Sequence, residues 1–158
     1  MLGSTYDTQT CSVARALEIV GERWTLLILR DVFLGIRRFE DIRRDLGVAR
    51  NVLTGRLQAL VDHGVLERHP YQERPVRHEY RLTERGLGLW PVITALMAWG
   101  DEYAPAPGGP PTVIVHRGCG GRLVDRRCET CGTVVADPRE ARAVAGPGAA
   151  PDHPLLAR

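Results

Sequence analysis

The sequence predicts a mainly helical fold that carries a small β-hairpin and is followed by a small β-ribbon module. Apolar residues recur at helical spacing in the first part of the chain, and the spacing changes to strand-like alternation after Gly64. A cysteine- and glycine-rich segment then follows a Pro/Gly stretch. We therefore expect a flexible arm over residues 1–10, a helical domain over 11–103, a linker over 104–111, a cysteine-rich module over 112–137 and a disordered tail over 138–158.

The composition is that of an ordinary globular chain. Of its 158 residues 44% are hydrophobic, and the net charge is +2, with arginine but no lysine. Residues 37–81 hold ten arginines against seven acidic residues, so a modest basic patch is expected there. No stretch approaches the ~20 apolar residues of a membrane span, and the first ten residues lack a signal-peptide pattern. We therefore expect a cytoplasmic protein with no membrane partner.

Four helices are expected in the first part of the chain. Their apolar residues are three, four or seven positions apart, as in Val13, Leu17 and Val20, and so line one face of a helix. A glycine follows each apolar stripe and ends the helix. The expected helices span residues 12–20, 24–34, 39–46 and 50–64.

A β-hairpin and a last helix are expected to follow. Residues 65–69 and 79–83 alternate like strands, and residues 70–78 between them read as a long, partly basic tip. The last helix should run over residues 84–102, where Pro91 is expected to kink it.

The third helix, the turn at Gly47 and the fourth helix form a helix-turn-helix, and the hairpin forms its wing. The fold is therefore a winged helix-turn-helix, mainly α with an α+β character. On the fourth helix Leu53, Leu57 and Leu60 face the core, and short polar side chains face outward, as a helix in the major groove of DNA requires. An ordinary solvated helix also shows such a face. The candidate DNA contacts are Arg37, Arg38, Arg50, Asn51, Thr54, Gly55, Gln58, Arg74 and Arg77.

Five motifs follow one another in the helical domain: CSVARAL from Cys11, GERWTLLILRD from Gly21, GIRRF from Gly35, NVLTGRL from Asn51 and EYRLTERG from Glu79. In this order they resemble HxlR-type transcriptional regulators of the MarR-like superfamily. The resemblance implies a homodimeric, sequence-specific regulator of double-stranded DNA, which we expect to be a repressor. It also implies that the first and last helices form the dimer interface.

The start of the fourth helix departs from that resemblance. The family usually has a serine or threonine as the cap, whereas this sequence has Val48 and Ala49. Alanine cannot accept the first amide hydrogen bonds, a loss of about 1 kcal/mol. A DNA phosphate or Asn51 would take the place of the cap. Asp62 on the outward face would repel phosphate, so the far end of the helix is expected to leave the groove.

Cys11 at the start of the first helix is a candidate redox site. The helix dipole and the free amides at that end favour a thiolate. Some HxlR-type regulators resemble thiol-based redox sensors that use a cysteine near this position. The alternative is a small buried side chain that packs against a partner subunit.

The cysteine-rich module repeats a [His/Cys]-x-x-Cys-Gly pattern, with ligand candidates His116, Cys119, Cys128 and Cys131. Four nitrogen and sulfur ligands form a closed tetrahedral site, which indicates structural zinc. A module this short has too little core to fold unaided. The alternatives are a metal-free ribbon and a redox pair of Cys128 with Cys131. Short strands are expected at residues 112–115, 123–124 and 133–135.

Two further functions were weighed against regulation. A winged-helix scaffold whose ribbon binds a protein partner is the alternative that the weak net charge leaves open. An enzyme is not expected, because a four-ligand site leaves no open position and no catalytic set is present. The regulator is also expected to respond to a small-molecule effector, in a pocket lined by Trp24, Trp90 and Trp99.

Overall fold

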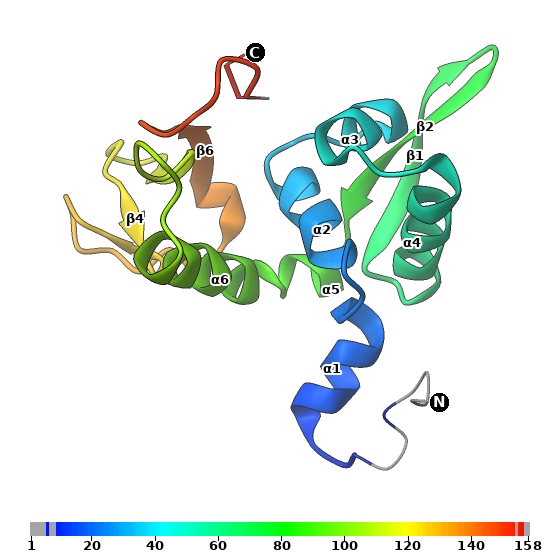
Figure 1. The fold of residues 1–158 in the computed structure, drawn as a ribbon, viewed down its shortest axis with the longest axis horizontal. Coiled ribbons are helices and arrows are strands. Elements are labelled where there is room, and N and C mark those ends of the chain that lie inside the picture. Colours follow the sequence, from blue (N-terminus) through cyan, green and yellow to red (C-terminus); the bar gives the residue numbers. More distant parts are fainter. Residues whose placement is uncertain (1–5, 7–8, 154, 157–158) are drawn as a thin grey trace. The chain divides into compact units, whose positions relative to one another are not determined.

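A computed structural model of the chain describes residues 6, 9–153 and 155–156 (Figure 1). The chain divides into two compact units, Met1–Thr83 and Glu84–Arg158. This division falls before the last helix, whereas the sequence suggested a break after it, at residues 104–111. Most of the expected N-terminal arm, residues 1–10, lies outside the described residues.

The first unit contains the four expected helices: α1 Ser12–Val20, α2 Thr25–Phe33, α3 Phe39–Leu46 and α4 Arg50–Asp62. The mainly helical fold class is thereby confirmed. The predicted inward face of α4 is confirmed too, because Leu53, Leu57 and Leu60 are almost fully buried. Helix α4 ends before Gly64, which takes a left-handed φ of 66° that favours glycine.

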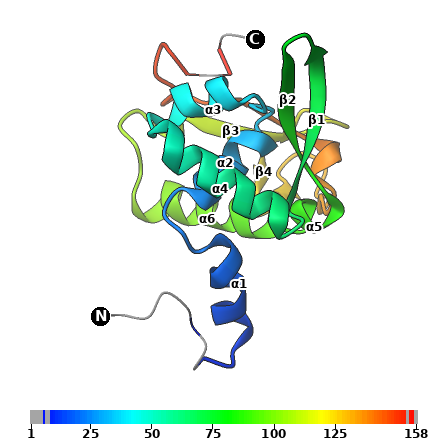
Figure 2. The ribbon, with the colours of Figure 1, turned by 90° about the vertical axis from the view of Figure 1, so that its right-hand side faces the viewer.

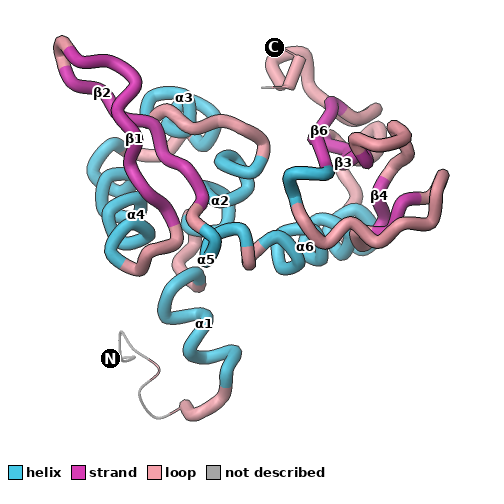
Figure 3. The backbone as a smooth tube through the Cα atoms, turned by 180° about the vertical axis from the view of Figure 1, so that it is seen from behind, coloured by secondary structure: helices cyan, strands magenta, loops and turns pink. Residues whose placement is uncertain are grey.

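The hairpin consists of β1 Leu66–Glu73 and β2 Val76–Leu82, which pair antiparallel. Strand β1 lies beside α4, and the tip of the hairpin projects beyond the helices (Figures 1 and 3). The prediction of a long loop over residues 70–78 was wrong, because the strands continue to a short turn at Arg74 and Pro75. The register shifts between Pro70 and Gln72. This irregularity accommodates a proline that has no amide hydrogen for the ladder.

In the second unit the single kinked helix expected over residues 84–102 is two helices, α5 Glu84–Leu87 and α6 Trp90–Tyr103. The break falls at Gly88, a poor helix former. Pro91 lies in the first turn of α6, where its missing amide hydrogen costs no hydrogen bond. The predicted kink at Pro91 was therefore wrong. No described helix has the length and apolarity required to cross a membrane.

The ribbon differs from the three strands that the sequence predicts. Strand β3 Thr112–His116 pairs antiparallel with β6 Ala141–Ala145, which the 3₁₀ turn η1 Pro138–Glu140 precedes. The short strands β4 Leu123–Val124 and β5 Arg127–Cys128 pair with each other (Figure 2). The expected strand at residues 133–135 is reduced to one bridge between Arg127 and Val134. The prediction of a disordered tail was wrong for β6, whose small alternating residues gave no clear strand signal.

Helix α2 carries a buried carboxylate, Asp31, with 0% of its side chain exposed. Its Oδ1 accepts hydrogen bonds from Arg30 Nε at 2.9 Å and from Nη2 at 2.6 Å. Its Oδ2 has no hydrogen-bond partner among the described residues. Burial raises the pKa of Asp31 to about 7, although Arg30 opposes this shift.

The raised pKa makes stability depend on pH. Between an unfolded-state pKa of 3.8 and a folded-state pKa of about 7, the folded state keeps a proton that the unfolded state releases, so stability falls as pH rises. Asp31→Asn keeps the acceptor for Arg30 and cannot ionise. As the pH rises from 4 to 8, we expect the free energy of unfolding of the variant to increase by up to roughly 4 kcal/mol relative to that of the wild type. Urea unfolding at both pH values measures this, and a constant difference would contradict it.

Candidate nucleic-acid interface and metal centre

The outward face of α4 is exposed along its predicted DNA contacts. Arg50, Asn51, Thr54 and Gly55 are exposed, and Gln58 is half-buried. The cap residue Ala49 makes no side-chain hydrogen bond, as its sequence predicts, and the first turn of α4 holds no acidic residue. The amides and the positive end of the helix dipole at this turn therefore face no carboxylate of the first turn, which suits an anion.

Arg50 is held at the start of α4 by two neighbours on α3. Its guanidinium pairs with Glu40, and its Cζ lies 5.1 Å from the centroid of the Phe39 ring. Hydrogen bonds from Arg43 and then Arg50 hold the pKa of Glu40 below its usual range. Glu40 is thus an ionised competitor for the arginine that a DNA phosphate would bind.

Gln58 is occupied within the protein. Its Nε2 donates to Asp62 Oδ1 at 2.6 Å, and its Oε1 accepts a hydrogen bond from Arg68 on β1. Base readout by Gln58 therefore requires that these bonds be exchanged. Arg68 was not among the predicted contacts. Alternation along the first strand gave no signal for Arg68, because the buried Leu66 stands two residues before it.

The start of α3 with the residue before it, the start of α4 and the wing form a shallow cavity of about 480 Å³, which the carboxylates of Glu40 and Asp41 also line. Three arginines from separate elements line it: Arg38 before α3, Arg50 at the start of α4 and Arg77 on β2. The Cζ of Arg38 lies 4.4 Å from the centroid of the Tyr71 ring, a contact that the sequence did not reveal. An isolated bridge between Arg38 and Glu79 fixes this segment to β2.

The remaining predicted contacts do not line this cavity. Arg37 is exposed, and its carbonyl accepts a hydrogen bond from the Tyr80 amide at 2.8 Å. Arg74 is exposed in the wing turn. The hydroxyl of Thr54 donates to the Arg50 carbonyl at 2.8 Å.

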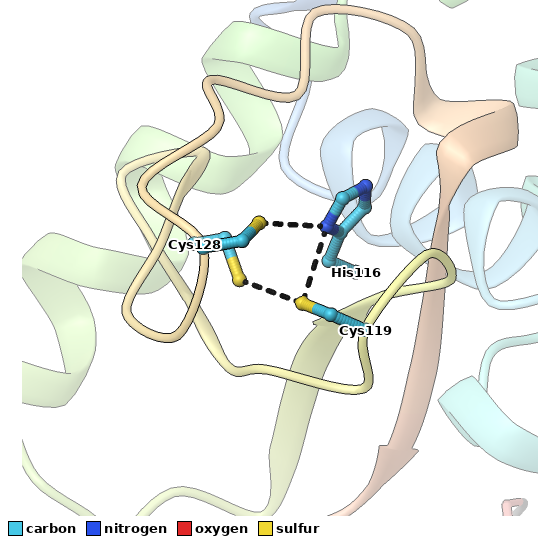
Figure 4. Close-up of side chains that lie close together, drawn as sticks. His116, Cys119 and Cys128 are labelled. Atoms are coloured by element: carbon cyan, nitrogen blue, oxygen red, sulfur yellow. Dashed lines mark hydrogen bonds between the residues drawn. The ribbon is translucent and has the colours of Figure 1, made fainter.

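The four predicted metal ligands converge in the second unit, and their ligand atoms all lie within 4.8 Å of one another (Figure 4). His116 Nδ1 is 3.4 Å from Cys119 Sγ and 3.3 Å from Cys131 Sγ. Cys119 Sγ is also 3.4 Å from Cys128 Sγ. A tetrahedral zinc with Zn–S bonds of about 2.3 Å separates its ligand atoms by about 3.6–3.8 Å. The arrangement can therefore hold a metal ion after small side-chain movements.

Two equivalent turns carry these ligands. In the first turn the Gly120 amide donates to the His116 carbonyl at 2.8 Å, and in the second the Gly132 amide donates to the Cys128 carbonyl at 2.9 Å. Gly120 and Gly132 have φ values of 75° and 74°, which favour glycine as the sequence pattern predicted. The two turns, each of which carries one pair of ligand candidates, therefore have the same geometry.

The local environment shifts the pKa values of two of these cysteines in opposite directions. The hydroxyl and amide of Thr133 lower the pKa of Cys131 to about 6, which favours the thiolate that binds metal. The Gly121 amide acts in the same direction on Cys119, but the neighbouring Cys128 and Cys131 thiols raise the pKa of Cys119 overall. A side chain at Gly121 would place its Cβ 2.6 Å from Cys128 Sγ, so the cluster requires glycine there.

The other predicted site residues stand apart from these two sites. Cys11 is exposed at the start of α1, and its Sγ accepts a hydrogen bond from the Ala14 amide at 3.3 Å. Trp90 is buried whereas Trp99 is exposed, because nine residues at about 100° each place them on opposite faces of α6. Trp24 is half-buried in the first unit. The structure therefore gives no cavity shared by Trp90 and Trp99.

A helix-turn-helix with an exposed polar second helix, flanked by an arginine-bearing β-hairpin, defines the class of winged-helix DNA-binding proteins. The family model for the HxlR-like helix-turn-helix matches residues 19–107. The chain belongs to this family. It is a DNA-binding transcriptional regulator and not an enzyme, as the sequence predicts.

The relatives are named as transcriptional regulators, and each match covers most of the relative's length. The uncharacterized HTH-type transcriptional regulators Mb3122 of Mycobacterium bovis and Rv3095 of Mycobacterium tuberculosis are each 51% identical over 138 residues, which is 87% of this chain and 87% of each relative. The regulator YdeP of Bacillus subtilis is 35% identical over 101 residues, covering 63% of this chain and 79% of YdeP.

Solved structures show the same fold. The transcription-factor candidate PA1607 has a TM-score of 0.68 and 36% identity, covering 82% of this chain and 92% of its own. The redox regulator HypR in its reduced form has a TM-score of 0.55 and 27% identity, covering 60% of this chain and 94% of its own.

Proposed function

We propose that this regulator is a homodimeric repressor that reads a specific duplex sequence with α4 and grips the flanking backbone with its wing. The cavity of about 480 Å³ carries the proposal, because it brings Arg38, Arg50 and Arg77 together next to the uncapped start of α4. Guanidinium groups that converge from three elements suit a DNA phosphate better than a base edge.

Base readout falls to the side chains farther along the outward face of α4. Asn51 is exposed at the second position of the helix, and its amide can pair with an adenine edge. Gly55, one turn later, is exposed, and nothing lies within 4 Å of the Cβ that a side chain would add there. The backbone can therefore approach the groove closely at Gly55.

Dimerisation is supported by exposed apolar side chains on the two helices expected to pair. On α6 the side chains of Val92, Leu96, Trp99 and Tyr103 are 42%, 49%, 61% and 64% exposed and recur at helical spacing; we call them the α6 stripe. On α1, Val13 and Leu17 are 68% and 38% exposed. Exposed apolar stripes of this kind mark interaction sites, and burial of the α6 stripe against a second copy of the chain would remove it from water.

We also propose that the His116 cluster holds structural zinc and that Cys11 senses oxidation. Four nitrogen and sulfur ligands leave no open coordination position, so the zinc would stabilise the ribbon rather than catalyse. For Cys11, support comes from its exposure, from its hydrogen bond with the Ala14 amide, and from the similar fold of HypR, which is a redox regulator.

The test measures affinity for the DNA upstream of the protein's own gene over a range of salt concentrations. Arg77→Ala should weaken binding to specific and random duplexes alike and reduce the salt slope by about one. Asn51→Ala should weaken only specific binding, by about 10-fold or more. Arg142→Ala removes an exposed arginine of β6 and is the control.

Two results of this titration, and one result of a separate diamide treatment, separate the alternatives. Equal affinities for wild type, Arg77→Ala and Arg142→Ala would refute the proposed interface. Absence of binding at low salt would instead favour a winged-helix scaffold whose ribbon binds a protein. Diamide treatment should change the affinity of the wild type but not of Cys11→Ser, and an equal change in both would remove Cys11 as the sensor.

A further inference from the structure

We propose that a cavity within the second unit, between α6 and the ribbon, binds a small, mostly apolar molecule that carries one carbonyl or carboxylate oxygen. The cavity has a volume of about 270 Å³, close to the lower end of the usual range for ligand pockets. Ligand binding here is independent of the proposed DNA contacts. Only its regulatory consequence rests on the proposed function.

The walls of the cavity combine apolar and charged side chains and come from two parts of the second unit, α6 and the ribbon, that lie side by side (Figure 3). Helix α6 contributes Met97 and Ala98, and the ribbon contributes Ile114 and Leu123. A molecule of about one ring would remove this apolar surface from water, which is the main source of affinity in such pockets.

Arg126 supplies the polar feature of this cavity. It lines the cavity, and its Nε is buried without a hydrogen-bond partner among the described residues. A buried donor without an acceptor is unfavourable, and a ligand oxygen within reach would satisfy it. The geometry therefore points to an acceptor on the ligand.

The backbone at Arg126 belongs to a tight turn. Asp125 and Arg126 form the turn between β4 and β5 and have φ values of 44° and 65°, a left-handed conformation that favours asparagine and glycine. Positive φ at both central residues is the usual geometry of a two-residue hairpin turn, so it follows from the pairing of β4 with β5. This turn fixes the position at which the side chain of Arg126 begins.

Charge limits the ligand class further. Arg122 and Arg126 line the cavity, and so do the carboxylates of Asp101, Glu102 and Asp125. Three carboxylates against two guanidinium groups disfavour a multiply charged anion such as a phosphate. One oxygen on a small ring or branched chain fits this balance.

The experiment titrates the full-length protein with benzoate and, separately, with benzamide, and follows the backbone amides by NMR. We expect saturable shifts at the amides of the cavity-lining residues with at least one probe, and the stronger probe tells a carboxylate from a neutral carbonyl. Arg126→Asn should weaken binding by about 10-fold, the effect of one lost charge-assisted hydrogen bond. Asparagine tolerates the left-handed conformation, so the turn should be retained.

Two further variants make the test decisive. Ala98→Leu fills the cavity from a helical position and should abolish saturable shifts, whereas Arg142→Asn on β6 should leave them unchanged. No saturable shifts with either probe, or unaltered binding by folded Arg126→Asn and Ala98→Leu, would overturn the proposal. Because no DNA is present, this outcome is distinct from failure of the DNA interface.

Discussion

Cys128→Ser is expected to abolish zinc binding and to unfold the ribbon. Cys128 is 1% exposed, its Sγ lies 3.4 Å from that of Cys119, and it pairs with Leu123 in the β4–β5 ladder. Structural zinc contributes roughly 10–16 kcal/mol to the folding of small metal-binding modules. Serine is a weak ligand for zinc, so we expect zinc affinity to fall by at least about 1,000-fold.

The measurement combines zinc content with hydrogen exchange. Wild type should carry one zinc per chain, and chelation should raise exchange at the ribbon amides while α2 and α4 stay protected. Cys11→Ser is the control. Cys11 belongs to the other unit, so this substitution should leave the zinc content unchanged. A wild type purified without zinc that also fails to bind added zinc would refute the structural zinc centre.

Trp99→Glu is expected to convert the proposed dimer into a monomer. Trp99 is 61% exposed in the α6 stripe, and its ring centroid lies 5.5 Å from that of Tyr103. Large aromatic residues supply much of the energy of protein interfaces, and a carboxylate there would also have to be desolvated. The dissociation constant of the dimer should rise by about 100-fold or more.

Sedimentation equilibrium measures the dimer, and DNA titration measures the consequence. A monomer binds only one half-site, so loss of the dimer should lower the affinity for an operator with two half-sites. Val134→Glu introduces the same charge at an exposed apolar residue of the ribbon and should leave the dimer intact. A dimeric Trp99→Glu protein would exclude the α6 stripe as the interface.

Local sequence patterns were sufficient where neighbours in the chain decide the structure. Helix α1 has the predicted bounds, because its apolar spacing and Gly21 act within a few residues of each other. The four residues that come together in the cluster were also predicted as a set, since each pair is three residues apart and each turn requires its own glycine. The same holds for the uncapped start of α4 at Ala49.

Patterns were insufficient where distant segments compete for a partner. Residues 141–145 carry only small side chains beside one arginine, and they form a strand because β3 offers them a free edge. The strands of the wing are longer than predicted, since pairing across the hairpin carries them past Pro70. The ends of such strands depend on contacts between distant residues, which the spacing of neighbouring residues does not reveal.

Periodicity and fixed spacings in the sequence thus predicted the winged-helix class and the four residues of the cluster, and the resemblance of five motifs predicted the family. The tertiary structure alone decided which side chains meet. It placed Arg38 over Tyr71, joined Gln58 to Arg68, and enclosed Arg126 beside α6. These contacts form between residues far apart in the chain, and only the packing of helices and strands against one another brings such residues together.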